Sequence, residues 1–137
     1  MTPEELRSRR VLAFIKIAAE ELGAAKMLSG QHRPQSAYFL QQTVEKLARA
    51  ILEMDDVPVG PTHQIQQLAR MITNRPELAE EFVKLDELPS AATKFRYPGP
   101  TGNIGDIPVA RLENLQVAVE RLFMKVDNIV ESLMRQK

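Results

Sequence analysis

The sequence has no cysteine and no tryptophan, and only two of its 137 residues are histidine. Because cysteine is absent, the chain forms no disulfide, holds no thiolate nucleophile and builds no Cys-based zinc site. The two histidines, His32 and His63, stand in no H-E-x-x-H or similar metal-binding spacing. We therefore expect neither a metal site nor a cofactor of the protein's own.

Glycine-rich phosphate motifs are also missing, since neither a P-loop nor G-x-G-x-x-G occurs. In the stretch Pro98–Gly102, two prolines remove backbone donors that a phosphate cradle would use. No G-x-S-x-G elbow supports a Ser-His-Asp hydrolase. The sequence predicts no catalytic residue.

Neither sign of charge predominates, because 18 Lys and Arg residues balance 18 Asp and Glu residues. No overall field therefore directs the chain to nucleic acid or anionic lipid, although local basic patches leave nucleic acid open as a partner. No run approaches the ~18 uncharged apolar residues of a transmembrane helix. Glu4, Glu5 and Lys16 interrupt any signal-peptide pattern. We expect a cytoplasmic protein that does not contact a membrane.

Apolar residues recur at helical spacing, and no strand-like alternation or internal repeat occurs. Thr2 is expected to cap the first helix, and Pro89 to kink or restart the fourth. The expected helices cover about 3–28, 35–54, 62–72 (with Thr62 as cap) and 108–135, with loops at 55–61 and 97–108. The fourth helix is expected to start near Pro76 and to run through Leu85 to the break at Pro89, before Phe95. This pattern predicts a single domain, residues 1–137, folded as an all-α, up-and-down bundle of four to five helices.

The last helix has the most regular apolar pattern. Its seam residues alternate spacings of three and four: Leu112, Leu115, Val119, Leu122, Val126, Ile129 and Leu133. Such a seam packs inside the helix's own bundle or forms part of a dimer interface.

The second helix carries two unlike faces. Its apolar face consists of Leu40, Val44, Leu47 and Ile51. Gln42, Glu45 and Arg49 lie almost opposite, with Gln41 and Lys46 beside them and apolar residues at the border. A polar stripe of this kind needs partners from a ligand, another subunit or the rest of the fold.

Three sequence blocks together resemble the HEPN family (higher eukaryotes and prokaryotes nucleotide-binding domain). These blocks are Q-Q-x-x-E-K-x-x-R-A-I-L within residues 41–52, T-H-Q-I at 62–65 and F-R-Y-P at 95–98. The resemblance implies a helical bundle, a homodimer and pairing with a small nucleotidyltransferase. In such a pair the HEPN chain supplies a binding or accessory surface, and the partner supplies the metal and the chemistry.

Ribonuclease members of that family resemble one another in a motif of Arg, four to six residues, then His. Here the motif requires Arg at 25–27 or 56–58, and those positions are Ala-Lys-Met and Asp-Val-Pro. The resemblance therefore favours a non-catalytic protein that binds a nucleotide or serves a nucleotidyltransferase. A toxin-like ribonuclease of a toxin–antitoxin pair, and a structural helical adaptor without a small-molecule site, remain as alternatives.

The candidate ligand-binding residues come from the polar stripe and from the third block. They are Gln42, Glu45, Lys46, Arg49, Arg96 and Tyr97. An Arg guanidinium group can bind two phosphate oxygens at once, in a bidentate arrangement, and a tyrosine ring can stack on a base. The plainer alternatives are an intrahelical Glu45–Arg49 ion pair on a solvated face, and Arg96 at a helix terminus. For His63 we expect a neutral imidazole hydrogen-bonded within the bundle.

Overall fold

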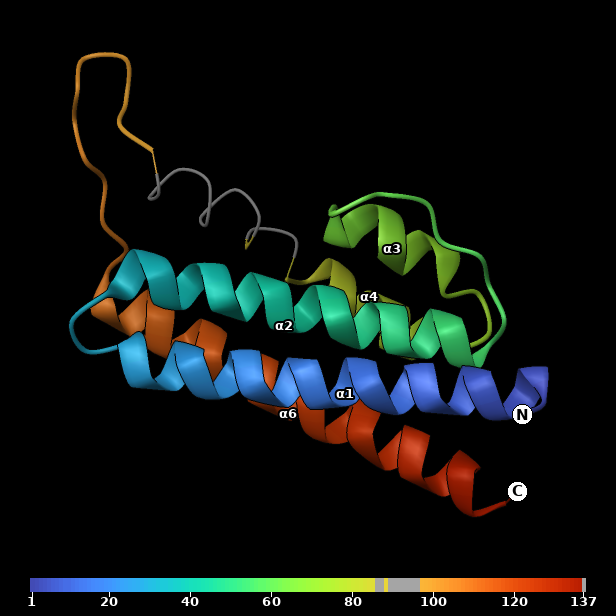
Figure 1. Ribbon diagram of the computed structural model, residues 1–137. Coiled ribbons are helices and arrows are strands. Elements are labelled where there is room, and N and C mark those ends of the chain that lie inside the picture. The colour runs from blue at the N-terminus through green and yellow to red at the C-terminus, as the bar shows by residue number, and fades with distance from the viewer. Residues whose placement is uncertain (86–87, 89–96, 137) are drawn as a thin grey trace.

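The computed structural model describes residues 1–85, 88 and 97–136, and the described residues form helices and loops without a strand (Figure 1). The helices are α1 (Pro3–Leu28), α2 (Arg33–Met54), α3 (Ile65–Met71), α4 (Pro76–Val83) and α6 (Val109–Arg135). The predicted all-α class is confirmed. The expected break at Pro89 lies outside the described residues. In the described part of the chain, no helix is both long and apolar enough to cross a membrane.

Helices α1 and α2 form the antiparallel hairpin against which α3 and α6 pack (Figure 1). Thr2 caps α1 as predicted, because its Oγ1 accepts a hydrogen bond from the Glu5 amide at 3.1 Å. Near the turn, the Ser36 hydroxyl donates to the Ala25 carbonyl at 2.7 Å and ties the two helices together. The hairpin is thus fixed by polar contacts as well as by its apolar interface.

Helix α2 is the central helix, since it packs against α1, α3 and α6. Leu40, Leu47 and Ile51 are fully buried, and burying each side chain of this size contributes about 1.5–3 kcal/mol before chain entropy is counted. The central position also means that the polar stripe of α2 is covered by other parts of the chain. That stripe is not the solvated face considered from the sequence alone.

Helix α6 packs along the hairpin through most of the predicted seam, but its last two predicted seam residues are less buried than the others. Ile129 and Leu133 are only half-buried, whereas Val130 is 1% exposed. A straight helix repeats every 3.6 residues, so its buried face drifts away from a strict 3.5-residue pattern along three heptads. Val130, four residues after the buried Val126, therefore lies on the buried face of α6.

The short helices α3 and α4 pack on each other and lie against the hairpin through α3 (Figure 1). The predicted cap of α3 at Thr62 is wrong, because the helix begins at Ile65 and its N-cap is Gln64. The Thr62 hydroxyl instead accepts from the Gln64 amide at 3.3 Å and donates to Gln67 at 2.6 Å. Thr62 therefore stabilises the turn before the helix.

Other helix boundaries also differ from prediction. Helix α2 begins at Arg33 because Pro34 is tolerated in the first turn, where no backbone donor is needed. Helix α4 ends at Val83, with Lys84 as its C-cap. Residues 97–108 contain no helix, as predicted, and Arg33 Nε donates to the Ile107 carbonyl at 3.0 Å near the end of this loop.

Candidate functional site

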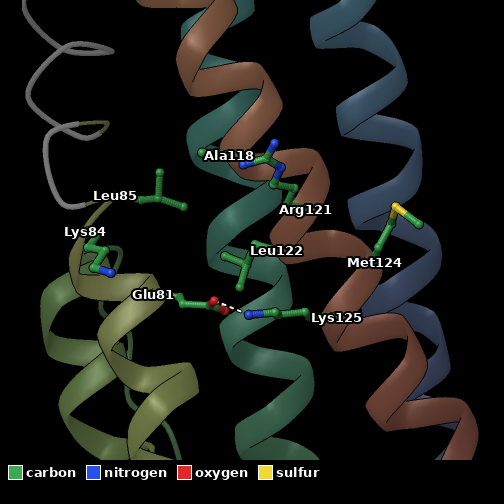
Figure 2. Close-up of a pocket in the computed structure, with 8 residues that line it drawn as sticks. All are labelled: Glu81, Lys84, Leu85, Ala118, Arg121, Leu122, Met124 and Lys125. Carbon is green, nitrogen blue, oxygen red and sulfur yellow. Dashed lines mark hydrogen bonds and ion pairs between the residues drawn. The ribbon is translucent and has the colours of Figure 1, made fainter.

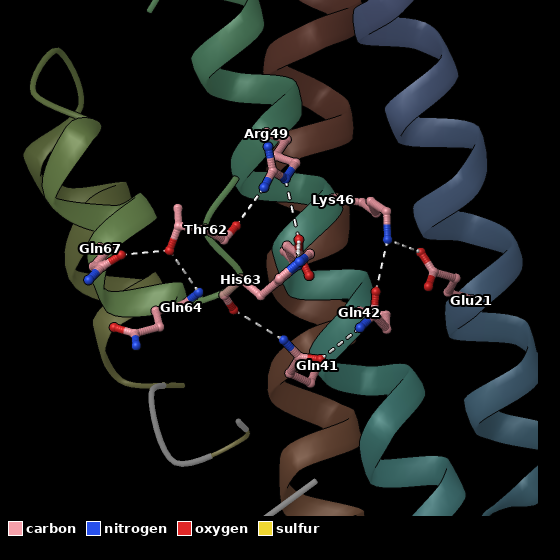
Figure 3. A network of polar contacts seen from close by, with 10 residues as sticks. Glu21, Gln41, Gln42, Lys46, Arg49, Thr62, His63, Gln64 and Gln67 are labelled. Atoms are coloured by element: carbon pink, nitrogen blue, oxygen red, sulfur yellow. Dashed lines mark hydrogen bonds and ion pairs between the residues drawn. The ribbon is translucent and has the colours of Figure 1, made fainter. Parts of the chain in front are cut away.

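The polar stripe of α2 meets the segment that precedes α3 and one residue of α1, and together they form a network of hydrogen bonds and ion pairs (Figure 3). We call this network the polar cluster. Its members are Glu21 of α1, Gln41, Gln42, Glu45, Lys46 and Arg49 of α2, and Thr62 and His63 of the connecting segment.

Glu45 lies at the centre of the polar cluster, with only 3% of its side chain exposed. Its Oε1 accepts from Arg49 Nε at 3.3 Å and from His63 Nδ1 at 2.8 Å. Its Oε2 is buried and has no hydrogen-bond partner among the described residues. Removing a carboxylate from water is unfavourable, so the ion pair with Arg49 and the contact with His63 are needed to keep Glu45 inside the fold.

Arg49 joins two elements, because its guanidinium also donates to the Thr62 carbonyl at 2.5 Å. Gln41 adds a longer bond, in which its amide donates to the His63 carbonyl at 3.4 Å. Two backbone carbonyls before α3 are therefore held by side chains of α2. These bonds fix where α3 begins and how it lies on the hairpin.

Lys46 occupies the α1 side of the polar cluster. Its ammonium group donates to Glu21 Oε1 at 3.1 Å and to Gln42 Oε1 at 3.0 Å. Burial raises the pKa of the Glu21 carboxyl above 4.5; the hydrogen bond and the positive charge of Lys46 oppose this shift, and the negative charge of Glu45 adds to it. Lys46 and Glu21 thus form a partly buried pair, in which desolvation raises the pKa of the Glu21 carboxyl more than Lys46 lowers it.

The formal charges of the polar cluster cancel when His63 is neutral. Glu21 and Glu45 carry two negative charges, and Lys46 and Arg49 carry two positive ones. The side chains of both cations are at least four-fifths covered, being 20% and 18% exposed. The cluster therefore presents no uncompensated cation to a phosphate group.

His63 is the part of the polar cluster that faces water, with 77% of its side chain exposed. An ionised carboxylate only accepts hydrogen bonds, so the contact with Glu45 requires the proton on Nδ1. In the neutral imidazole, Nε2 is then an acceptor on the opposite edge of the ring. The prediction of a hydrogen-bonded His63 agrees with this contact, but most of the side chain lies outside the bundle core.

Comparison with known families decides the identity of the fold. Residues 11–136 match the family model described as the HEPN domain. The chain belongs to the HEPN family. No curated protein and no solved structure matches the chain. The HEPN match includes every member of the polar cluster and confirms the resemblance seen in the sequence blocks.

The HEPN fold brings four of the six candidate ligand-binding residues together, namely Gln42, Glu45, Lys46 and Arg49 (Figure 3). Arg96 lies outside the described residues. Tyr97 begins the loop after it, and 61% of the residue is exposed. The assignment of all six residues to a ligand stays a prediction.

Two contributions to the polar cluster were missed from the sequence, namely Glu21 and the Thr62 carbonyl. Glu21 lies 25 residues before its partner Lys46, and Arg49 lies 13 residues before Thr62. Neither separation corresponds to neighbouring positions on one helix, so no local pattern indicates these contacts. In the described part of the HEPN chain, no group of three or more acidic or histidine side chains could hold a metal ion.

Proposed function

We propose that this HEPN chain is a non-catalytic protein that binds a nucleotide. The nucleotide part is supported by membership of the HEPN family. The non-catalytic part is carried by the polar cluster, whose charged groups are used to hold the fold together and which includes one imidazole only.

A single imidazole is a poor basis for acid–base catalysis of phosphoryl transfer, which uses one group to remove a proton and another to supply one. The other histidine, His32, is the N-cap of α2, thirteen residues before Glu45. At 1.5 Å per residue, it lies about 20 Å along the helix axis from the residue that holds His63. His32 and His63 of one chain therefore do not act on the same reacting group.

Thermal unfolding against a panel of nucleotides, with and without magnesium, tests the proposal. A ligand present at 100 times its dissociation constant stabilises the folded state by about 2.7 kcal/mol, which corresponds to a rise in Tm of several degrees. We expect such a rise for at least one nucleotide. If no member of the panel shifts the transition, the chain is not a nucleotide-binding protein.

A ribonuclease is the second candidate, and one specific observation favours it. The buried Glu45 carboxylate holds the exposed His63 imidazole at Nδ1 and leaves Nε2 facing away, an arrangement suited to a general base. Incubation of the purified protein with RNA, alongside His63→Gln, separates the two candidates. Cleavage by the wild-type protein that is lost in His63→Gln would replace the binding proposal by this one.

Two partners follow from family membership and stay predictions for this chain. They are a second copy of the chain and a small nucleotidyltransferase. The mass of the protein in solution at high concentration tests the first: we expect a dimer, and a strict monomer would exclude it.

A further inference from the structure

Helices α4 and α6 border a groove of about 570 Å³, which lies within the range of 300–1,000 Å³ found for small-molecule sites (Figure 2). Its apolar lining residues are Leu85, Ala118, Leu122 and Met124. Three cations surround this lining, namely Lys84 after α4 and Arg121 and Lys125 of α6. The groove thus combines an apolar surface with positive charge.

Two of these cations are available to a ligand. Lys125 is paired with Glu81 of α4, across the groove (Figure 2). Lys84 and Arg121 are exposed, and neither forms a hydrogen bond or an ion pair with the residues that the structure describes. With three cations and one carboxylate, the described residues that line the groove carry a net charge of plus two, in a chain whose overall charge is zero.

The positive charge arises because α6 separates its charges between two faces. Glu120, next to Arg121 in sequence, turns toward α1 and pairs with Lys26 at 2.7 Å. Arg121 and Lys125 are four residues apart and therefore lie one above the other on the face that borders the groove. From Ala118 to Lys125 this face is about 10 Å long, the scale of a mononucleotide rather than of a long polymer.

We infer that the α4–α6 groove is the nucleotide site, with the phosphates on Lys84 and Arg121 and the base and ribose over Leu85, Ala118 and Leu122. This inference rests on the proposed function and places the ligand away from the stripe of α2. The ligand class is a nucleoside di- or triphosphate, whose negative charge complements the positive charge of the groove. Guanidinium and ammonium groups bind phosphate by charge-assisted hydrogen bonds. Among the described residues, neither Lys84 nor Arg121 has a carboxylate partner from which a ligand would have to release it.

Calorimetric titration with ADP tests the site. The variants are Lys84→Ala/Arg121→Ala for the groove, Arg49→Ala for the polar cluster, and Lys16→Ala/Arg70→Ala as the control. Lys16 and Arg70 are also exposed and unpaired within the described part of the chain, so the control removes the same charge elsewhere. Pyrophosphate and adenosine, each titrated alone, report the phosphate and base contributions.

We expect the groove variant to lose affinity for ADP by about tenfold for each cation removed, with the control unchanged. Pyrophosphate binding should fall in parallel, while any adenosine binding should be retained.

If the wild type binds ADP and the groove variant binds it equally well, the site is elsewhere but the proposed function stands. If Arg49→Ala alone abolishes binding while remaining folded, the site lies at the polar cluster. Absence of ADP binding by the wild type would overturn the groove site, and absence of binding to every nucleotide would overturn the function as well.

Discussion

The polar cluster and the α4–α6 groove both contain several charged side chains, but the charges are used differently. In the polar cluster, Lys46 and Arg49 are largely covered and are neutralised by Glu21 and Glu45. In the groove, Lys84 and Arg121 are exposed and make no ion pair within the described part of the chain. The number of charged residues in a region therefore does not identify a binding surface, because paired charges already have their partners.

The difference has an energetic consequence. Removing a buried, paired carboxylate strongly destabilises the fold, because the partner charge is left without compensation. An exposed, unpaired cation contributes little to folding, so its removal affects mainly what binds there. The two regions should consequently respond in opposite ways to mutation, with stability changing in the first and ligand affinity in the second.

The largest effect is expected for Glu45→Ala. This change removes the shared acceptor of Arg49 and His63 and leaves a guanidinium that is 18% exposed without its carboxylate. We expect the free energy of unfolding to fall by about 3 kcal/mol, with a drop in Tm of about 10 °C. Chemical denaturation measures it, and Glu20→Ala, at an exposed position of α1, serves as the control. A loss no larger than that of the control would show that the pairing inside the polar cluster does not stabilise the fold.

A smaller, pH-dependent effect is expected at Glu21, whose pKa is raised above 4.5 by burial. The folded state then holds this proton more tightly than the unfolded state, so ionisation of Glu21 lowers stability as the pH rises from 4.5 through the folded pKa. Glu21→Gln does not ionise. The free energy of unfolding of this variant should therefore rise relative to wild type as the pH increases from 4.5 through the folded pKa of Glu21. Denaturation curves at several pH values measure the difference, with Glu20→Gln as control. If the difference in free energy of unfolding between Glu21→Gln and wild type stays constant or falls with rising pH, the pKa of Glu21 is not raised in the folded state.

The smallest effect on stability is expected in the groove. Lys84→Ala/Arg121→Ala removes two exposed, unpaired cations, so the free energy of unfolding should stay within about 0.5 kcal/mol of wild type. Thermal unfolding without ligand measures this. A loss comparable to that of Glu45→Ala would mean that these cations hold the fold together, and the contrast between the two regions would fail.

The sequence predicted the helices well and the surroundings of their polar residues poorly. The capping hydroxyl of Thr2 and the end of α1 at Leu28 follow from residues within a few positions, and both agree with the structure. The stripe of Gln42, Glu45 and Arg49 was also visible from helical spacing. Its burial was not, because it depends on Thr62 and His63, which approach α2 only after the chain has turned.

The groove illustrates the same limit. Lys84 and Arg121 are 37 positions apart, and neither belongs to a motif that was recognised in the sequence. Acidic residues stand close to both along the chain, namely Glu81 and Glu120. The end of α4 and one face of α6 border the same groove, which brings the two cations together. The pairing of Glu120 with Lys26 turns the Glu120 carboxylate toward α1.

The sequence by itself determined the all-α class, most helix boundaries and the family, because these depend on short-range periodicity, capping and turn residues. It determined which residues form the apolar face of α2 and most of the seam of α6. Only the tertiary structure decided which charges are neutralised and which remain available. Pairing depends on distances between helices that are remote in sequence, and burial determines how strongly each charge needs its partner.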